Sequence, residues 1–429
     1  MARPELTDVA RVARDALLLS LGSIAGAALS FLAWIFLARA LLPEDYGALG
    51  AAMAFVALFQ TVGDFGLNYY AIREGAKDPQ RATGVIRALL GPKLVMLMSA
   101  TLLVVALAFL LPFRTAERGL ILVYVATLPV AGVATYLSCL LNAHRRMMRL
   151  AAIQVGERLA YAVLVPIVMT VGLGVLGATV AAVVSGILYA GFAIAAIRPL
   201  RTGPLWPPAP PRTWKPHLMA SFQFGLAALL LGGIQRVDVV LLAVLSDPVS
   251  LARYVAATQV LSLLLLTATG LAQAAFPYVV RRLHRGEMSL PILGKWTAVL
   301  GVLSSALALA ASLSAPFVLP VLFGPRLGDS ASIFAVLAWA IVPAFTAVPS
   351  SLALDALNLQ KVHVANAAVM VGISLVLNFS WIPTMGAAGA AWAAVASWGY
   401  GLFVGVPIAF LVIRRHGRVP RTDGAQGLA

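Results

Sequence analysis

The sequence predicts an all-α polytopic membrane protein, with twelve transmembrane helices in two pseudo-symmetric six-helix lobes around a central cavity. The composition, the spacing of apolar segments and an internal repeat support this prediction. Of the 429 residues, 61% are hydrophobic and only 11% are charged, whereas a soluble domain is about half apolar and about a quarter charged. The composition therefore indicates a membrane protein.

Twelve apolar segments are long enough to cross a bilayer, whose ~30 Å hydrocarbon core takes about 20 helical residues. Glycine and proline breaks at 172–174 and 383–385 divide two longer runs into separate spans. The segments are 17–38, 48–70, 90–111, 119–141, 151–171, 174–197, 218–245, 254–279, 293–315, 331–354, 362–382 and 386–412. An even number of spans places both termini on one side of the membrane.

The second half of the chain repeats the first. LNAHRRMMRLAAIQVG from Leu141 is matched by LNLQKVHVANAAVMVG from Leu357, and GVLGATVAAVVS from Gly174 is matched by GAAGAAWAAVAS from Gly386. Duplicated membrane bundles with an interface between the halves are typical of transporters.

A proline-rich segment separates the two copies. Residues 198–217 read RPLRTGPLWPPAPPRTWKPH, and prolines keep such a segment extended. We therefore expect an N-terminal lobe over 1–197, a cytosolic linker over 198–217, a C-terminal lobe over 218–413 and a cytosolic tail over 414–429.

The net charge of +15 follows the expected topology. With the N-terminus in the cytosol, most Lys and Arg residues, Lys93 among them, fall at cytosolic span ends and loops. The opposite side holds only Arg39, Arg114, Arg118, Arg253 and Arg326. This bias is the positive-inside rule. It places both termini in the cytosol and accounts for the charge without a nucleic-acid partner.

Five ionisable residues fall inside predicted spans, where a charge is costly and is a functional candidate by default. They are Asp64, Glu157, Arg158, Arg236 and Asp238. Arg236 lies about nine residues, or ~14 Å, from the outer end of its span, so it needs a polar cavity or a buried partner. Asp238 lies on roughly the opposite helix face. One of these two could face a cavity while the other holds the bundle together, and an ion pair between helices is the alternative for both.

Polar side chains recur along the second and eighth spans. Gln60, Asp64 and Asn68 are spaced every four residues and form one stripe, and the eighth span carries Gln259 and Gln273 close to one face. Two matched polar faces predict a water-accessible cavity between the lobes. Hydrogen bonding between helices is the alternative.

Three further arginines are candidates for the same cavity. Arg158 lies ~10 Å inside the fifth span and neighbours Glu157, so a structural pair is the alternative. Arg39 and Arg73 lie at span ends, where they could extend to the interface or line a cavity mouth.

Motifs for other chemistries are missing from the sequence. It contains no GxxxxGK[ST] loop, HExxH, CxxC or GxSxG. The histidines lack metal-ligand spacing, and the single cysteine, Cys139, cannot form an internal disulfide. We therefore expect no catalytic residue, no metal and no cofactor.

Several stretches resemble polysaccharide flippases. ARALLPEDYGALGAA from Ala38 is similar to their first outer loop, and Asp64-Phe65-Gly66-Leu67 with Arg73-Glu74 resembles the segment after that loop. Asp238 and then LSDPVSLARYVAA resemble the opening of their second half, and FPYVVRRL, PFVLPVLFGP and LALDALNLQK resemble later loops. The resemblance is to the oligosaccharide flippase branch of the multidrug/oligosaccharidyl-lipid/polysaccharide exporter superfamily.

The resemblance implies two six-helix lobes in a V, with spans one, two, seven and eight lining the cavity. It implies a transporter that flips polyprenyl-diphosphate-linked oligosaccharide to the outer leaflet by alternating access, for O-antigen, capsule or exopolysaccharide biosynthesis. The protein would lie in a bacterial inner membrane. Its partners would be the lipid-linked substrate, membrane lipids, and polysaccharide polymerase and glycosyltransferases.

The expected site combines both lines of reasoning. The candidate substrate-binding residues are Arg236, Arg39, Arg73, Arg158, Gln60, Asn68, Gln259 and Gln273, and the ion-coupling candidates are Asp64 and Asp238. The alternative function is a cation-coupled multidrug or small-molecule exporter of the same fold, which should have a cavity dominated by acidic and aromatic groups. A membrane glycosyltransferase or polymerase is disfavoured because the outer loops are short.

Overall fold

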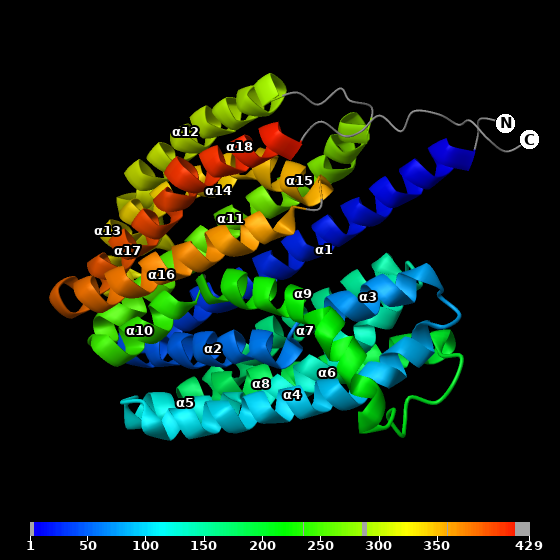
Figure 1. The fold of residues 1–429 in the computed structure, drawn as a ribbon. Helices are drawn as coiled ribbons and strands as arrows, with labels where there is room; N and C mark the ends of the chain where they lie inside the picture. Colours follow the sequence, from blue (N-terminus) through cyan, green and yellow to red (C-terminus); the bar gives the residue numbers. More distant parts are fainter. Residues whose placement is uncertain (1–3, 235, 285–289, 358, 417–429) are drawn as a thin grey trace, which may run out of the picture.

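The computed structural model describes residues 4–234, 236–284, 290–357 and 359–416. Within these ranges every regular element is a helix, and the helices form two groups that lie side by side (Figure 1). The all-α prediction is therefore confirmed.

The first group of helices comprises α1 (Pro4–Ala40), α2 (Pro43–Asp64), α3 (Leu67–Lys77), α4 (Ala82–Leu110), α5 (Thr115–Tyr124), α6 (Thr127–Ala143), α7 (Met147–Thr170) and α8 (Gly174–Ile197). After the linker come α9 (Trp214–Ile234) and α10 (Val237–Leu245). The second group comprises α11 (Pro248–His284), α12 (Leu290–Phe323), α13 (Ser330–Leu337), α14 (Ile341–Thr346), α15 (Val348–Ala356), α16 (Gln360–Met385), α17 (Ala387–Tyr400) and α18 (Val406–His416).

Eleven helical stretches of the described chain are long and apolar enough to cross a membrane. They coincide with eleven of the twelve expected spans. The remaining expected span, 218–245, is divided between α9 and α10, which end and begin on either side of residue 235. The protein is therefore a multi-pass membrane protein, and α9 and α10 together cover the expected seventh span.

The second span is also broken, between α2 and α3. Phe65 and Gly66 both have positive φ, 42° and 74°, a conformation that ends a helix and that a residue other than glycine seldom adopts. Asp64 is consequently the last residue of α2. A Cβ atom added to Gly225 of α9 would lie 2.7 Å from the Phe65 carbonyl oxygen, so α9 crosses this break in direct backbone contact.

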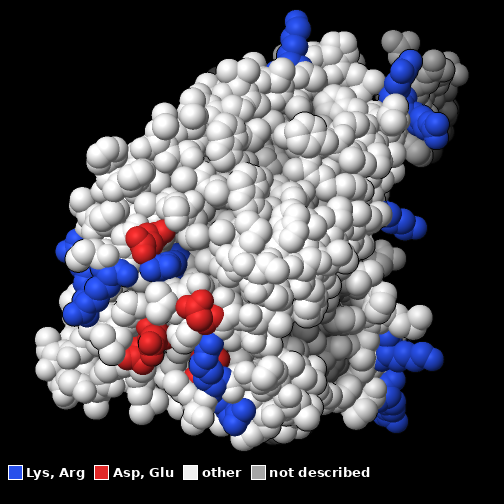
Figure 2. All heavy atoms as spheres, turned by 90° about the vertical axis from the view of Figure 1, so that its left-hand side faces the viewer, with Lys and Arg blue, Asp and Glu red and all other residues white. Residues whose placement is uncertain are grey.

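The two ends of the bundle differ. The start of α1 and the end of α18 lie at the same end of the bundle, toward the right in Figure 1, which we call the terminal face. At the other end, the opposite face, Arg39 of α1 donates a hydrogen bond to the Leu322 carbonyl oxygen of α12 (2.9 Å). Arg114 donates one to the Ser246 carbonyl oxygen (2.6 Å). Figure 2 shows basic and acidic side chains gathered in one region of this face.

The lobes pack tightly near the opposite face. A Cβ atom added to Gly47 of α2 would lie 3.0 Å from the Ala252 nitrogen of α11, and one added to Gly50 would lie 2.6 Å from a Val255 methyl group. The two helices therefore contact each other with no room for a side chain at either glycine.

The hydrophobic core is shared by the lobes in the half near the opposite face and divided in the other half. The largest cluster joins Leu49 and Phe55 of α2 to Tyr254 of α11 and Phe323 of α12. Toward the terminal face, one cluster is built from the first lobe and two smaller ones from the second. The lobe interface is consequently closed at the opposite face.

Candidate functional site

A polar cavity lies where the first lobe meets the break in the seventh span. This junction cavity has a volume of about 360 Å³. It is lined by Ala57, Gln60, Thr61, Asp64, Asn68, Lys93, Gly132, Thr135, Gly232 and Arg236. Helices α2, α3, α4 and α6 of the first lobe thus enclose it together with the α9–α10 junction.

A second polar cavity adjoins the first. This lobe cavity has a volume of about 530 Å³ and lies among helices of the first lobe. It is lined by Gly22, Ser23, Gly26, Ala27, Ser30, Gln60, Tyr124, Thr127, Ala131, Thr135, Gln154, Glu157, Arg158, Ala182, Gly186 and Tyr189. Because Gln60 and Thr135 line both cavities, the two form one polar region.

Arg236 is the residue that precedes α10, and it lines the junction cavity. Its side chain is exposed, and it makes no hydrogen bond or ion pair with any residue that the structure describes. Tyr124 and Arg158 from the lobe cavity and the buried Asp238 of α10 lie near enough to interact with it electrostatically. The break between α9 and α10 therefore places an unpaired guanidinium beside a second arginine.

Asp64 forms an ion pair with a residue that was expected elsewhere. The Lys93 ammonium lies 2.6 Å from the Asp64 carboxylate, and the Lys93 side chain is only 1% exposed. Lys93 also lies over the Tyr136 ring, 5.9 Å from its centroid. The expectation of Lys93 at a solvated span end was wrong, because α4 begins at Ala82 and carries this residue into the bundle.

The predicted polar stripe lies on the junction cavity, with Gln60 and Asp64 on α2 and Asn68 on α3. Gln60, Asp64 and Asn68 all line it, and the buried side-chain oxygen of Asn68 has no hydrogen-bond partner among the described residues. In the lobe cavity, Arg158 lies 3.9 Å from Glu157, and its side chain is 53% exposed. This pair is loose, so the Arg158 guanidinium remains open to the cavity.

Two sequence candidates lie away from the cavities. Asp238 is buried, accepts a hydrogen bond from the Tyr254 hydroxyl and accepts another from the Val239 amide (2.8 Å). It thus links α10 to α11. Arg39 lines a separate hollow on the opposite face and links α1 to α12.

The eighth span contributes less than the polar pattern suggested. Gln259 is half-buried, and neither polar cavity includes a described residue of α11. The side chain of Gln273 lies outside the described residues. The polar region is therefore built mainly from the first lobe, with Arg236 and Gly232 from the seventh span.

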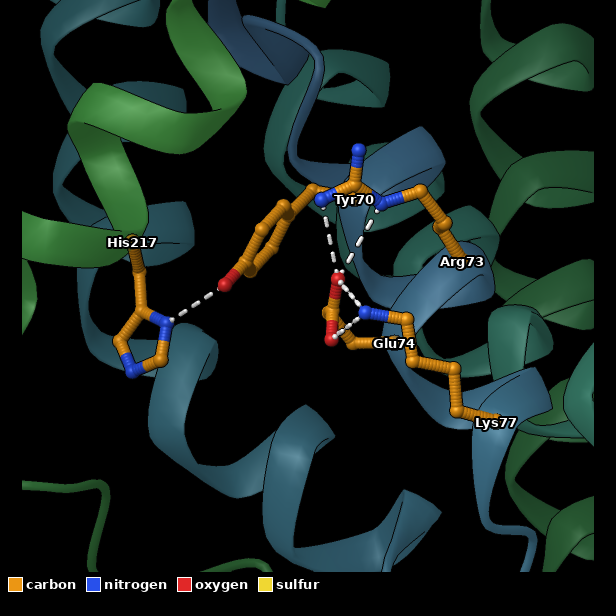
Figure 3. A network of polar contacts seen from close by, with 5 residues as sticks. All are labelled: Tyr70, Arg73, Glu74, Lys77 and His217. Carbon is orange, nitrogen blue, oxygen red and sulfur yellow. Dashed lines mark hydrogen bonds and ion pairs between the residues drawn. The ribbon is translucent and has the colours of Figure 1, made fainter. Parts of the chain in front are cut away.

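Arg73 belongs to a contact network at the terminal face (Figure 3). Glu74 accepts hydrogen bonds from Arg73 (3.0 Å) and Lys77 (2.7 Å), and the Tyr70 hydroxyl lies 3.1 Å from a ring nitrogen of His217. The hydrogen bonds from Lys77 and then from Arg73 hold the pKa of Glu74 below its usual value. The network connects α3 to the start of α9 rather than lining a polar cavity.

Several lining residues had no recognisable signal in the sequence. Tyr124, Thr135, Gln154 and Tyr189 are single polar residues in apolar segments, without the four-residue spacing of α2. No group of three or more His, Cys, Asp or Glu residues that could hold a metal occurs in the part of the chain that the structure describes.

Comparisons with known proteins agree with this architecture. The family model described as polysaccharide biosynthesis protein matches residues 12–282. No curated protein sequence matches the chain.

The solved structures with a similar fold include three transporters. One is an inward-facing multidrug resistance transporter of the MATE family, in the MOP superfamily, with 17% identity over 94% of this chain and 98% of that chain and a TM-score of 0.70. Another is the lipid II flippase MurJ in an inward closed conformation, with 12% identity over 93% and 87% and a TM-score of 0.75. A third, a MOP superfamily transporter from Pyrococcus furiosus, has 18% identity over 95% and 96% and a TM-score of 0.65.

These solved structures share the fold of this chain. The family match extends across the first lobe, the linker, α9, α10 and nearly all of α11. The chain therefore belongs to the polysaccharide biosynthesis protein family and has the fold of the MOP superfamily transporters.

Proposed function

We propose that this protein flips a polyprenyl-diphosphate-linked oligosaccharide from the inner to the outer leaflet of a bacterial inner membrane, for surface polysaccharide biosynthesis. The observation that carries the proposal is the unpaired Arg236 guanidinium in a cavity inside the bundle. A charge at such a depth is costly unless it serves a ligand or a partner. The terminal face is cytosolic in this proposal.

The charges of the polar region favour an anionic ligand. Its described lining contains three cations, Lys93, Arg158 and Arg236, against two carboxylates, Asp64 and Glu157. Guanidinium groups bind phosphate oxygens through paired hydrogen bonds. The diphosphate would lie beside Arg236 and Arg158.

The uncharged part of the lining suits the sugars. Hydroxyl and amide side chains of the lobe cavity, such as Ser23, Thr127 and Gln154, can donate and accept hydrogen bonds as sugar hydroxyls require. The lipid tail would remain in the bilayer between the lobes. Closure at the opposite face corresponds to the state that receives substrate from the cytosol.

Export of a small cationic compound is the competing function for this fold. Such a pump should have a cavity dominated by acidic and aromatic groups. The described lining carries one more cation than carboxylate, which favours the flippase.

Charge reversal at Arg236 tests the proposal. In a host strain that lacks the chromosomal gene, Arg236→Glu should abolish surface polysaccharide while the amount of membrane-inserted protein stays normal, because the diphosphate then meets a carboxylate. Arg253→Gln is the matched control, since Arg253 forms an ion pair with Asp329 (2.6 Å) on the opposite face. It should retain polymer.

Polymer and protein are measured by gel analysis of extracted polysaccharide and by immunoblot. Normal polymer in the Arg236→Glu strain would refute the assignment. Hypersensitivity of the deletion strain to cationic drugs, with polysaccharide unchanged, would favour the exporter.

A further inference from the structure

The charge balance of the polar region leaves a diphosphate only partly neutralised. Lys93, Arg158 and Arg236 against Asp64 and Glu157 give the described lining one net positive charge. A diphosphate diester carries two negative charges. Binding it would leave one excess negative charge in an environment of low polarity, where uncompensated charge is strongly disfavoured.

The Asp64–Lys93 pair offers a way to remove that excess. Asp64 is 20% exposed and lines the cavity, whereas Lys93 is 1% exposed and lies behind it at 2.6 Å. Lys93 is a fixed cation that needs an anion at this position. A phosphate oxygen in the cavity can replace the carboxylate as its partner once that carboxylate is neutral.

The other groups around Asp64 do not offer a second carboxylate. Among the described residues, the titratable or charged side chains that face it are Lys93 of α4, Tyr136 and Cys139 of α6, and Arg236 at the α9–α10 junction. The buried Asp238 of α10 interacts electrostatically with Arg236, but it is hydrogen-bonded to the Tyr254 hydroxyl of α11 and does not line the cavity. On α5, Glu117 is bonded to Arg114 near the opposite face.

We infer that one proton binds together with the lipid diphosphate and that Asp64 takes up this proton. The inference rests on the proposed function. The proton passes from solvent to an Asp64 carboxylate oxygen. The Lys93 ammonium keeps its protons and exchanges its carboxylate partner for a phosphate oxygen. The lining then carries two net positive charges, which balance those of the diphosphate.

This arrangement differs from an exchange mechanism, in which a proton and the substrate compete for one site. In the exchange case, protonation would weaken substrate binding. Here protonation strengthens it, and by linkage the substrate strengthens protonation equally. The sign of the pH dependence therefore separates the two mechanisms.

The test uses the full-length protein in detergent and a short-chain probe, farnesyl-diphospho-N-acetylglucosamine. Because its diphosphate is esterified at both ends, it lacks the second ionisation that a phosphate monoester shows at a pKa of about 6. Calorimetric titration in two buffers of different ionisation enthalpy counts the protons taken up. Over the pH range in which binding and protonation are fully coupled, wild-type protein should take up one proton per bound probe. In that range the Kd for the probe should rise about tenfold for each unit of increasing pH.

Variants assign the proton to its carboxylate. Asp64→Asn should bind the probe without proton uptake and with a flat pH profile. Because this variant leaves Lys93 buried without a carboxylate, the double variant Asp64→Asn, Lys93→Gln gives a second measurement should the single variant fold poorly, and it too should take up no proton. Glu157→Gln should keep the wild-type pH slope, whatever its affinity.

The outcomes separate this inference from the proposed function. Probe binding that is lost in Arg236→Gln but shows no proton uptake, or a Kd that falls as the pH rises, overturns the inference and leaves the flippase proposal standing. Retention of proton uptake in Asp64→Asn overturns it as well. Absence of probe binding by wild-type protein at every pH refutes both.

Discussion

Filling the glycine contacts between α2 and α11 should weaken the closed state of the opposite face. An alanine Cβ at Gly47 would lie 3.0 Å from the Pro248 carbonyl oxygen and from the Ala252 nitrogen, and one at Gly50 would lie 2.6 Å from a Val255 methyl group. Ordinary van der Waals contact needs 3.4 Å or more. Since the atoms facing Gly47 belong to the backbone, α11 has to move as a unit.

The expected magnitude follows from this overpacking. Added methyl groups in a well-packed core cost about 1–3 kcal/mol, which lowers the ratio of closed to open molecules about 5- to 150-fold. The open state loses this contact and should not bear the cost. Gly47→Ala combined with Gly50→Ala should therefore shift the population toward molecules that are open at the opposite face.

Pulsed electron paramagnetic resonance measures that shift. Spin labels at Thr115→Cys and Val249→Cys report the separation of the lobes, in a Cys139→Ala background that removes the single native cysteine. The short-distance fraction should fall in the double-alanine variant. Gly119→Ala is the control, because no atom lies within 4 Å of its added Cβ. Distances unchanged from wild type would refute the reasoning.

Three further perturbations have defined outcomes. Lys93→Met removes the more deeply buried partner of the Asp64–Lys93 ion pair. It should lower the thermal unfolding temperature in detergent and reduce the free energy of unfolding by about 3–5 kcal/mol. Asp247→Ala removes the side chain that accepts hydrogen bonds from the Val249 and Ser250 amides at the start of α11. It should lower the free energy of unfolding by about 0.5–2 kcal/mol. Gly225→Ala should impair transport, because its Cβ would meet backbone atoms of Phe65, just after α2, that cannot rotate away.

The Asp247 variant also has a pH signature. Partial burial raises the pKa of this carboxyl, but the hydrogen bonds from Ser250 and Val249 outweigh it and hold the pKa below its usual value. The carboxylate thus stabilises the folded state above its unfolded-state pKa, and the contribution is lost as the pH falls through the lower folded-state pKa. The difference in unfolding temperature between wild type and variant should shrink in acid, and a difference that grows would contradict this assignment.

Controls for the other two variants come from the same chain. Asp64→Asn combined with Lys93→Gln removes both charges. Its loss in the free energy of unfolding should be smaller than that of Lys93→Met alone, because no uncompensated charge stays buried. Gly84→Ala should transport normally, because open space surrounds its added Cβ. Equal losses for Gly84→Ala and Gly225→Ala would show that contact with Phe65 is not the cause.

The sequence was sufficient to predict the spans because hydrophobic length is a local property. Eleven of the predicted segments overlap helical stretches that are long and apolar enough to cross a membrane. The four-residue spacing also placed Gln60 and Asp64 correctly on one face of α2, whereas Asn68 reaches the same cavity from α3, beyond a break that the spacing did not predict.

Features that depend on contacts between helices could not be predicted from the sequence. The partner of Asp64 is on α4, and nothing in the local pattern around Lys93 distinguishes a buried ammonium from one at a span end. No proline near residues 234–237 indicates that α9 ends there and α10 begins. Arg39 was a candidate at a span end and Asp238 a candidate inside a span, yet each is held by a neighbouring helix and does not line the polar region.

The division of the seventh span has a consequence for how the duplicated halves work together. α9 belongs to the second copy by sequence, but it packs on α2, α3 and α4 of the first lobe, and also on α16. The boundary of the sequence repeat therefore does not coincide with a boundary in the packing of the helices. Because α9 contacts helices of both lobes, any change in the angle between the lobes must alter its packing on one side or the other.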